Sequence, residues 1–320
     1  MSENSAPTIS PVSVDLVLRE ELTHGDALIS TIAPILRHLL ANDEHSVFSD
    51  EIIARVRGMF SDIAGQLLTQ LAVSAGEPEM REHDLAQIGA LVNGMVAHPG
   101  FLGHVHALAL EWQLTERLQA RLALDPVLSP LLQALIAASD AQVAANAMAL
   151  LAAQARFAQG QRRMQLPLSE LPGDLFYAAL LGLREQAGEG TEELVAQAER
   201  ALRSNYDETR SRLGLTARLV AGMGGGATAA LSIAHAGAGI FLSALAMASG
   251  QDRDRAILAT NEGQLARFAL ALRAGGLKLE GIAEQFETLH PDVALPDGFD
   301  QLSSDRAAAL LARSADYSGS

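Results

Sequence analysis

The stretch between Arg218 and Asp252 contains no Asp, Glu, Lys or Arg, although the sequence on both sides of it is amphipathic and well charged. It reads LVAGMGGGATAALSIAHAGAGIFLSALAMASGQ. About 20 apolar residues are enough for a helix to cross a bilayer, so this run is long enough to be compared with a membrane span. Whether it is buried in lipid or in protein decides which folds are open to the chain.

The composition of the run favours burial in protein. Most of its apolar residues are Ala and Gly, and Gly222 and the three glycines at 224–226 interrupt any single helix at about 1 kcal/mol each relative to Ala. No Trp or Tyr flanks the run, and neither end carries the cluster of Lys and Arg that is typical of membrane spans. We therefore predict two or three short helices, closely packed through small residues, at the centre of an all-helical domain, and no membrane span.

The glycines of this run do not match a phosphate-binding loop. Such a loop needs a Lys and a Ser or Thr after its last Gly, whereas Gly226 is followed by Ala227 and Thr228. A dinucleotide-binding turn follows a strand, and the preceding SRLGLTARLV has a helical pattern. The glycines are therefore interpreted as helix breaks, and no cofactor is predicted.

The net charge and the absence of cysteine exclude several kinds of partner and several kinds of site. The formal net charge is −15, which disfavours nucleic acid and anionic membrane surfaces, because both are bound through Lys and Arg. The chain has no Cys, which excludes disulfides, thiol catalysis and cysteine metal sites. The first residues, MSENSAPTISPVSVD, lack the basic and apolar regions of a secretory signal, so we expect the cytoplasm.

Helical periodicity extends from Val14 to about Ala315, and sustained strand alternation is absent. The predicted fold class is all-α, with stacked antiparallel helix pairs in a solenoid-like body or an irregular helical bundle. We expect a disordered segment over 1–13, an N-terminal helical region over 14–124, a C-terminal HEAT-like helical region over 125–315 and a tail over 316–320. The main expected helices are 14–22, 26–40, one capped by Ser49 and reaching about Leu71, 84–96, 101–124, 127–138, 141–160, 174–186, 192–212, 264–274, 279–289 and 304–314.

Residues 233–251 and 258–276 align without gaps. The matched positions include Ile240 with Leu265 and Gly250 with Gly275. Each copy would be a short helix, a break and a longer helix that ends at Gly. The spacing of about 25 residues is shorter than that of HEAT or armadillo units, and Ala-rich sequence matches easily by chance, so a true repeat and a coincidence both stay open.

His98, His104 and His106 look like a metal cluster, but their spacing argues against one. A helical two-histidine site needs a separation of four, whereas His104 and His106 are two apart and diverge. The nearby carboxylate is Glu111. We predict no metal site, and no arrangement of Ser, His and carboxylates supports an enzyme.

Three features are candidates for binding a ligand or a partner. His235 lies in the uncharged run, where we expect it to be buried, with a proton-linked role as the alternative. Arg162 and Arg163 adjoin a Pro-rich connector and are candidates for receiving a carboxylate or phosphate, or for pairing with Glu170 or Asp174. Small side chains near Ile233, Phe241 and Leu245 leave room for a small apolar ligand between helices around 219–251.

The C-terminal half, from about 120 to 312, resembles a family of uncharacterised bacterial helical proteins with HEAT-like helix pairs. The resemblance rests on the packing motifs FLSALAMASGQ (241–251), LARFALALRAGGL (265–277), Leu289-His290-Pro291 and FDQLSSDRAAALLA (299–312). It implies a helical-repeat fold and carries over no functional residue.

These observations predict a non-enzymatic protein-interaction or regulatory module. Helical stacks present extended grooves, and an acidic body suits a basic or apolar segment of another protein. Self-association through Ala/Leu helix faces is also open. The alternative is the binder of a small apolar ligand described above.

Overall fold

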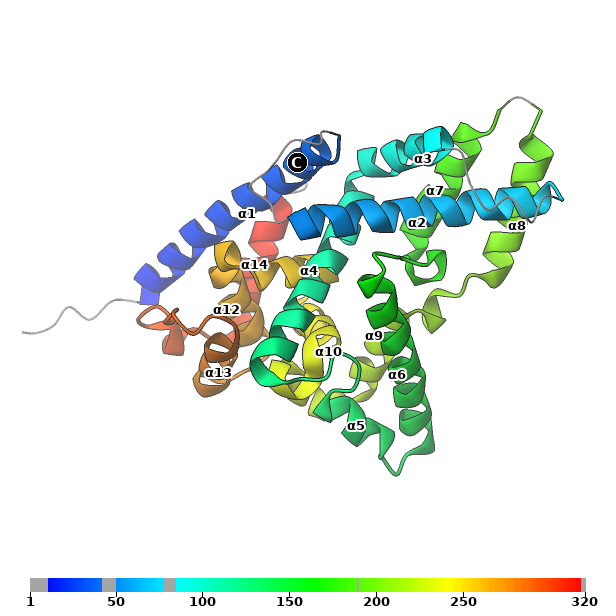
Figure 1. Cartoon of the computed structure of the whole chain (residues 1–320). Coiled ribbons are helices and arrows are strands. Elements are labelled where there is room, and N and C mark those ends of the chain that lie inside the picture. Colours follow the sequence, from blue (N-terminus) through cyan, green and yellow to red (C-terminus); the bar gives the residue numbers. More distant parts are fainter. Residues whose placement is uncertain (1–10, 42–49, 77–84, 189, 318–320) are drawn as a thin grey trace, which may run out of the picture. The chain divides into compact units, whose positions relative to one another are not determined.

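The computed structural model describes residues 11–41, 50–76, 85–188 and 190–317. Within these ranges every regular element is a helix and no strand occurs, which confirms the predicted all-α class (Figure 1). The α-helices are α1 (Pro11–Ala41), α2 (Asp50–Ser74), α3 (Leu85–Ala97), α4 (Pro99–Leu122), α5 (Pro130–Ile136), α6 (Ala141–Arg162), α7 (Gly173–Gln186), α8 (Glu192–Asn205), α9 (Arg212–Gly222), α10 (Ile233–Ser249), α11 (Arg253–Ala259), α12 (Leu265–Ala274), α13 (Leu279–Leu289) and α14 (Ser304–Tyr317). The 3-10 helices are η1 (Leu168–Glu170), η2 (Glu208–Arg210), η3 (Gly224–Leu231), η4 (Glu262–Gln264) and η5 (Phe299–Gln301). The segment 1–10 and the Ser49 cap lie outside the described residues.

Two predicted boundaries near the N-terminus and the middle of the chain are wrong. The two short helices expected before residue 41 form the single helix α1, which runs through Gly25. The Gln264 Nε2 donates a hydrogen bond of 2.6 Å to the Gly25 carbonyl. This tertiary contact outweighs the modest cost of a glycine inside a helix.

The predicted helix over 192–212 ends early, at Asn205, and α9 begins at Arg212. The intervening turn folds back over Gly214, where an added Cβ would lie 2.3 Å from the Glu208 carbonyl oxygen. A glycine at 214 therefore permits this close approach of two backbone segments.

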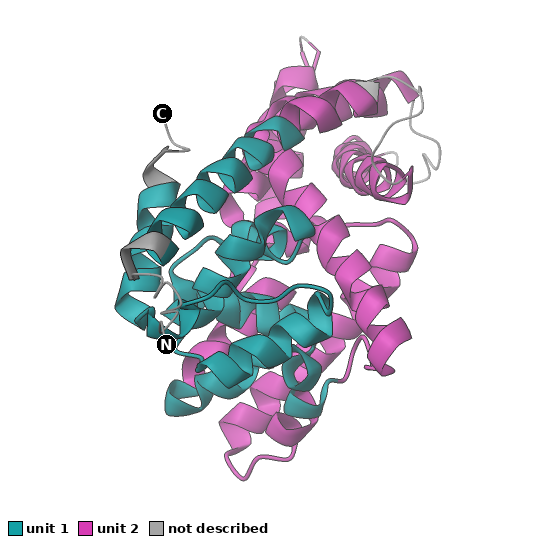
Figure 2. Ribbon diagram, turned by 90° about the vertical axis from the view of Figure 1, so that its left-hand side faces the viewer, with its two compact units in different colours: residues 1–32, 129–131, 223–320 teal, residues 33–128, 132–222 magenta. Residues whose placement is uncertain are grey.

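The chain forms two compact units, each described by itself (Figure 2). Unit 1 comprises residues 1–32, 129–131 and 223–320, and unit 2 comprises residues 33–128 and 132–222. The predicted boundary at 124–125 lies within unit 2.

Unit 2 is organised around α2, which contacts α3, α4, α7 and α8. Phe60, Ile63 and Leu67 of α2 are fully buried at the three- and four-residue spacing of one helix face. The Phe60 ring lies 5.6 Å from the Phe101 ring of α4. The chain's single tryptophan, Trp112, is buried in α4 and meets Phe157 of α6 at 6.3 Å, so unit 2 has an aromatic-assisted core.

Unit 1 is organised around α10 and α12, which pack against each other. α10 and η3 confirm the prediction that the uncharged run forms short helices rather than one. α10 is kinked at Gly237, whose φ of 73° and ψ of 162° are open to glycine and strained for other residues. A Cβ at this position would also lie 3.0 Å from the Ser129 Cβ.

The kink at Gly237 can be compared with the internal sequence similarity between residues 233–251 and 258–276. In the alignment, Gly237 corresponds to Glu262 of η4, so a break follows a short helical stretch in both segments. The C-cap residues that follow α10 and α12, Gly250 and Gly275, are also aligned. This agreement adds a structural parallel, and the repeat stays a prediction.

Among the described residues, no single helix is both long and apolar enough to cross a membrane. η3 and α10 meet that test of length and composition only when taken together, and they are bent by 112° at their junction. Most side chains of α10 are buried.

Candidate functional site

The sequence-derived candidates lie at separate places. Ile233, Phe241 and Leu245 are fully buried in unit 1, where the Phe241 ring packs 6.3 Å from the Phe268 ring. None of the three lines the cavity between α2 and α8, the smaller cavity beside it, or the cavities that α1 forms with η5 and with α14. The apolar-ligand alternative stays a prediction.

His235 is half-buried in the first turn of α10, so the expectation of a buried histidine is wrong. The reason is its position: the largely exposed η3 leads into this turn, in which only Ile233 is buried, and unbroken burial along α10 runs from Ala236 to Ala246. The absence of charged residues between Arg218 and Asp252 could not show that the first part of this run is exposed and the later part buried.

Arg162 and Arg163 are exposed at the end of α6. One of the two acids suggested for them, Glu170, instead accepts a hydrogen bond of 2.7 Å from the Arg212 backbone N–H. The Arg162 guanidinium lies 6.0 Å from the centre of the Trp112 ring. A role for these two arginines in binding stays a prediction.

The three histidines that were considered as a metal cluster, His98, His104 and His106, lie in or at the start of α4. The His98 Nδ1 accepts a hydrogen bond of 3.2 Å from the Phe101 N–H and caps α4, while His104 and His106 are buried in that helix. Both oxygens of Glu111 accept hydrogen bonds from Arg212, at 2.7 and 2.9 Å. In the described part of the chain, no group of three or more His, Cys, Asp or Glu side chains is placed to hold a metal ion.

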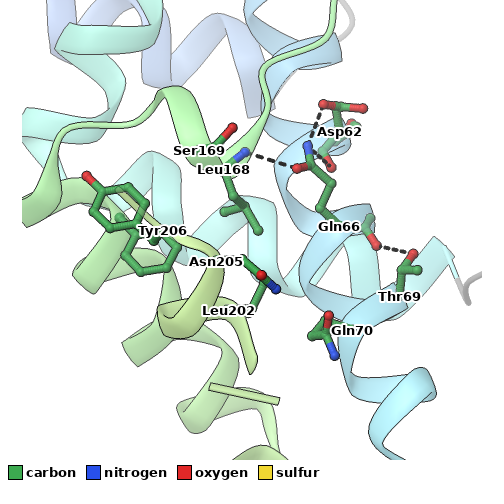
Figure 3. Close-up of a pocket in the computed structure, with 12 residues that line it drawn as sticks. Asp62, Gln66, Thr69, Gln70, Leu168, Ser169, Leu202, Asn205 and Tyr206 are labelled. Carbon is green, nitrogen blue, oxygen red and sulfur yellow. Dashed lines mark hydrogen bonds between the residues drawn. The ribbon is translucent and has the colours of Figure 1, made fainter. Parts of the chain in front are cut away.

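A cavity of about 630 Å³ lies in unit 2 between α2 and the end of α8 (Figure 3). We call it the α2–α8 groove. Its volume lies within the range of about 300–1,000 Å³ that is usual for ligand sites. Its lining residues are Ser61, Asp62, Gly65, Gln66, Thr69, Gln70, Leu168, Ser169, Phe176, Leu202, Asn205 and Tyr206.

One wall of the groove is built by α2, which holds the connecting segment that leads into η1. The Asp62 Oδ2 accepts hydrogen bonds from the Leu166 N–H at 3.0 Å and from the Gln66 Nε2 at 2.7 Å. Gln66 also donates to the Leu166 carbonyl and accepts from the Leu168 N–H, each at 3.0 Å. Because the two side chains are four residues apart, they share one helix face and together satisfy three backbone groups of the segment.

The opposite wall is formed by η1 and by the C-terminal end of α8. The Tyr206 ring stacks on the Phe176 ring, with centroids 4.0 Å apart, and the Tyr206 hydroxyl donates to the Leu171 carbonyl at 2.8 Å. Burial raises the Tyr206 pKa to about 12, assisted by the negative charges of Glu208, Asp174 and Asp207. The tyrosine is therefore a neutral, fixed part of the wall at physiological pH.

Four polar side chains of the groove remain available to a ligand. No side-chain hydrogen bond to another described residue is made by Ser61 or Gln70 on α2 or by Ser169 on η1. The side-chain oxygen of Asn205 accepts no hydrogen bond from a described residue, while its Nδ2 donates to the Ala201 carbonyl. Ser61 and Gln70 are nine residues apart, which corresponds to about 13 Å along the helix. Of these groups, Gln70 shares a helix face with Asp62 and Gln66, and together with Ser169 and Asn205 it can donate and accept hydrogen bonds to a ligand in the groove.

A smaller cavity of about 260 Å³ adjoins the groove, since Ser169 and Asn205 line both. It adds Arg156, Arg210 and the carboxylates of Glu170 and Asp207. Burial raises the pKa of Glu170, and the Arg212 hydrogen bond and the charges of Arg212 and Arg156 oppose that shift. In this smaller cavity the positive charges of the two arginines and the negative charges of the two carboxylates largely offset one another.

Sequence reasoning did not find the groove. Asp62, Gln66 and Gln70 are spaced by four residues along the polar side of α2, a pattern that usually marks a solvated helix face. The backbone partners of Asp62 and Gln66 lie about 100 residues away in the sequence, so no local pattern distinguishes these positions. Compared with family models, with curated proteins and with solved structures, the chain has no significant match.

We expect Asp62→Asn to stabilise unit 2 at pH 7. Burial is the main cause that raises the Asp62 pKa above its ordinary value of 3.8, so in the native protein stability falls as pH rises through the raised pKa. An asparagine oxygen can accept the hydrogen bonds from Leu166 and Gln66 without carrying the charge. Urea unfolding, followed by Trp112 fluorescence between pH 3.5 and 7, measures the difference.

The advantage of this variant over the native chain should grow as the pH rises above about 4. A variant that is less stable than the native protein at pH 7 would contradict the prediction, because it would mean that the carboxylate is stabilised by its neighbours. The exposed Asp50→Asn at the start of the same helix provides the matched control for loss of one negative charge on α2.

Proposed function

We propose that the protein is a non-enzymatic interaction module and that the α2–α8 groove binds an extended segment of another polypeptide. The observation that carries the proposal is that α2 already binds a connecting segment of its own chain, residues 166–168, through side-chain hydrogen bonds to backbone groups; Pro167 in this segment has an extended backbone and Leu168 begins η1. Gln70 lies one helical turn beyond Gln66 and lines the groove with an uncommitted amide. The same chemistry therefore continues into the open cavity.

The dimensions of the groove fit a short stretch of extended chain. Along the axis of α2 the lining residues from Ser61 to Gln70 span about 13 Å, which corresponds to about four residues of extended chain at about 3.3 Å per residue. Ser169 and Asn205 face α2 from the other wall (Figure 3), so both sides of such a segment can be hydrogen-bonded.

The charge of the protein favours a basic or neutral segment. The chain carries −15 overall, and the groove ends beside the C-terminus of α8, where the helix dipole favours positive charge. Asp207 and Glu208 follow directly after that helix end. An acidic segment would be repelled by the body as a whole.

Gly65 provides a direct test, because it lines the groove and an added Cβ would meet no atom within 4 Å. Gly65→Trp should fill the cavity without disturbing α2, where replacing a glycine favours the helix. Gly182→Trp is the matched control, since Gly182 is also a half-buried helical glycine of unit 2 with open space around it and does not line the groove.

The experiment selects peptides from a random-sequence phage library on the full chain and measures the affinity of a selected, labelled peptide by fluorescence anisotropy. We expect net-basic peptides, and we expect Gly65→Trp to weaken binding at least about tenfold while Gly182→Trp leaves it unchanged. Failure to enrich any peptide would contradict the proposal, as would peptides that bind both variants equally.

A further inference from the structure

A second cavity, of about 380 Å³, lies in unit 1 between α1 and α14. On α1 its lining side chains are spaced by three and four residues and so share one helix face. Leu22 and Leu310 are each 3 % exposed and form an apolar base. The full lining is Arg19, Leu22, Thr23, Asp26, Leu310, Arg313 and Ser314.

The carboxylate of this cavity is already committed to its own protein. One oxygen of Asp26 accepts a hydrogen bond from the buried Arg267, and the other accepts from the Ser314 hydroxyl. The Arg267 guanidinium also donates to Gln251 at 3.0 Å and to Gln264 at 3.2 Å. Asp26 therefore contributes little free negative charge to the cavity.

The two arginines of the cavity are uncommitted. Arg19 and Arg313 are exposed, and neither guanidinium forms an ion pair with another described residue. Such a pair stands out in a chain with 38 acidic and 23 basic residues. With Arg267 behind Asp26, the cavity has an excess of positive charge above an apolar base.

We propose that this cavity binds a small organic anion made of one carboxylate and a short aliphatic chain. Arg19 and Arg313 bind the carboxylate, because guanidinium groups form charge-assisted hydrogen bonds with carboxylate oxygens. Leu22 and Leu310 contact the aliphatic chain and remove it from water. This site is separate from the α2–α8 groove in residues and in chemistry.

Isothermal titration calorimetry of the full chain with octanoate, acetate and 1-octanol tests both halves of the ligand. Octanoate should bind at one site with a dissociation constant below about 1 mM. Acetate lacks the chain and 1-octanol lacks the charge, so each should bind at least about tenfold more weakly. Octanol binding as tightly as octanoate would overturn the role of the arginines, and acetate binding as tightly would overturn the role of the leucines.

A charge-matched pair of variants assigns the site. Arg19→Gln/Arg313→Gln should weaken octanoate binding at least about tenfold, because it removes both charge-assisted contacts. Arg162→Gln/Arg163→Gln removes the same two charges from exposed positions of unit 2 and should leave the affinity unchanged. Equal loss in both double variants, or no loss in the first, would overturn the proposal, and so would a lack of heat with octanoate.

Discussion

Replacement of Glu111 by Leu should lower the free energy of unfolding of unit 2 by about 3–5 kcal/mol, because it leaves a buried guanidinium without its carboxylate. Arg212 is 1 % exposed, Glu111 is fully buried, and the two form a bidentate pair between α4 and α9. The Arg212 guanidinium also lies 3.7 Å from the centre of the Phe157 ring. A charge in this position cannot be rehydrated without opening the core.

The measurement is thermal or urea unfolding followed by the fluorescence of Trp112, which is adjacent to Glu111 in the sequence and reports on unit 2. A loss of this size corresponds to a fall in melting temperature on the order of 10 °C for a unit of this length. The double variant Glu111→Leu/Arg212→Met should recover most of the loss, since a buried ion pair replaced by apolar residues is often neutral or stabilising.

The matched control is Glu193→Leu, which breaks the pair between Arg200 and Glu193 on the surface of α8. Those side chains are 71 % and 89 % exposed, so the pair contributes about 0–1 kcal/mol. Equal effects at Glu111 and Glu193 would show that the buried pair is not what holds α4 and α9 together.

Replacement of Arg267 by Met should destabilise unit 1 by a similar amount, about 3–5 kcal/mol. This side chain is 1 % exposed and donates to Asp26, Ser314, Gln251 and Gln264, which belong to four separate segments of the chain. Its loss leaves Asp26 without its cationic partner and several buried polar groups unsatisfied. Burial lowers the Arg267 pKa, which reflects the desolvation that these partners offset.

Unit 1 contains no Trp, so hydrogen–deuterium exchange resolved by peptide is the suitable measurement. Peptides from α12 and α14 should exchange about 100-fold faster or more, because exchange from core helices follows the free energy of opening. Arg273→Met on the same helix is the control, since Arg273 donates to the carbonyls of Leu302 and Leu277 and has a smaller expected effect. Similar acceleration in both variants would contradict the prediction.

The predictable part of this protein was the part that depends on local pattern. Apolar spacing and the positions of Pro and Gly gave the all-α class and most helix ends, such as the start of α6 at Ala141. The scarcity of large side chains and the glycines of the central run indicated short helices, and η3 and α10 have that form.

The groove, the buried ion pair and the arginine cavity depend on contacts between distant residues. Glu111 was considered as a metal ligand because sequence shows its histidine neighbours and not Arg212, which lies 101 residues away. One signal was present: a lone carboxylate in a largely apolar stretch of helix needs a buried partner. Arg19 and Arg313 could not be associated at all, since they lie at opposite ends of the chain.

That separation has a consequence for the order in which the protein folds during synthesis. Unit 1 joins the first helix to the last, through contacts such as Gly25 with Gln264 and Asp26 with Ser314, which are 239 and 288 residues apart. The ribosome releases the N-terminal helix long before its partners exist, whereas all of unit 2 has been made by residue 222. Unit 2 can therefore fold first. The apolar face of α1 stays exposed until translation ends, and during that time it can bind chaperones or aggregate.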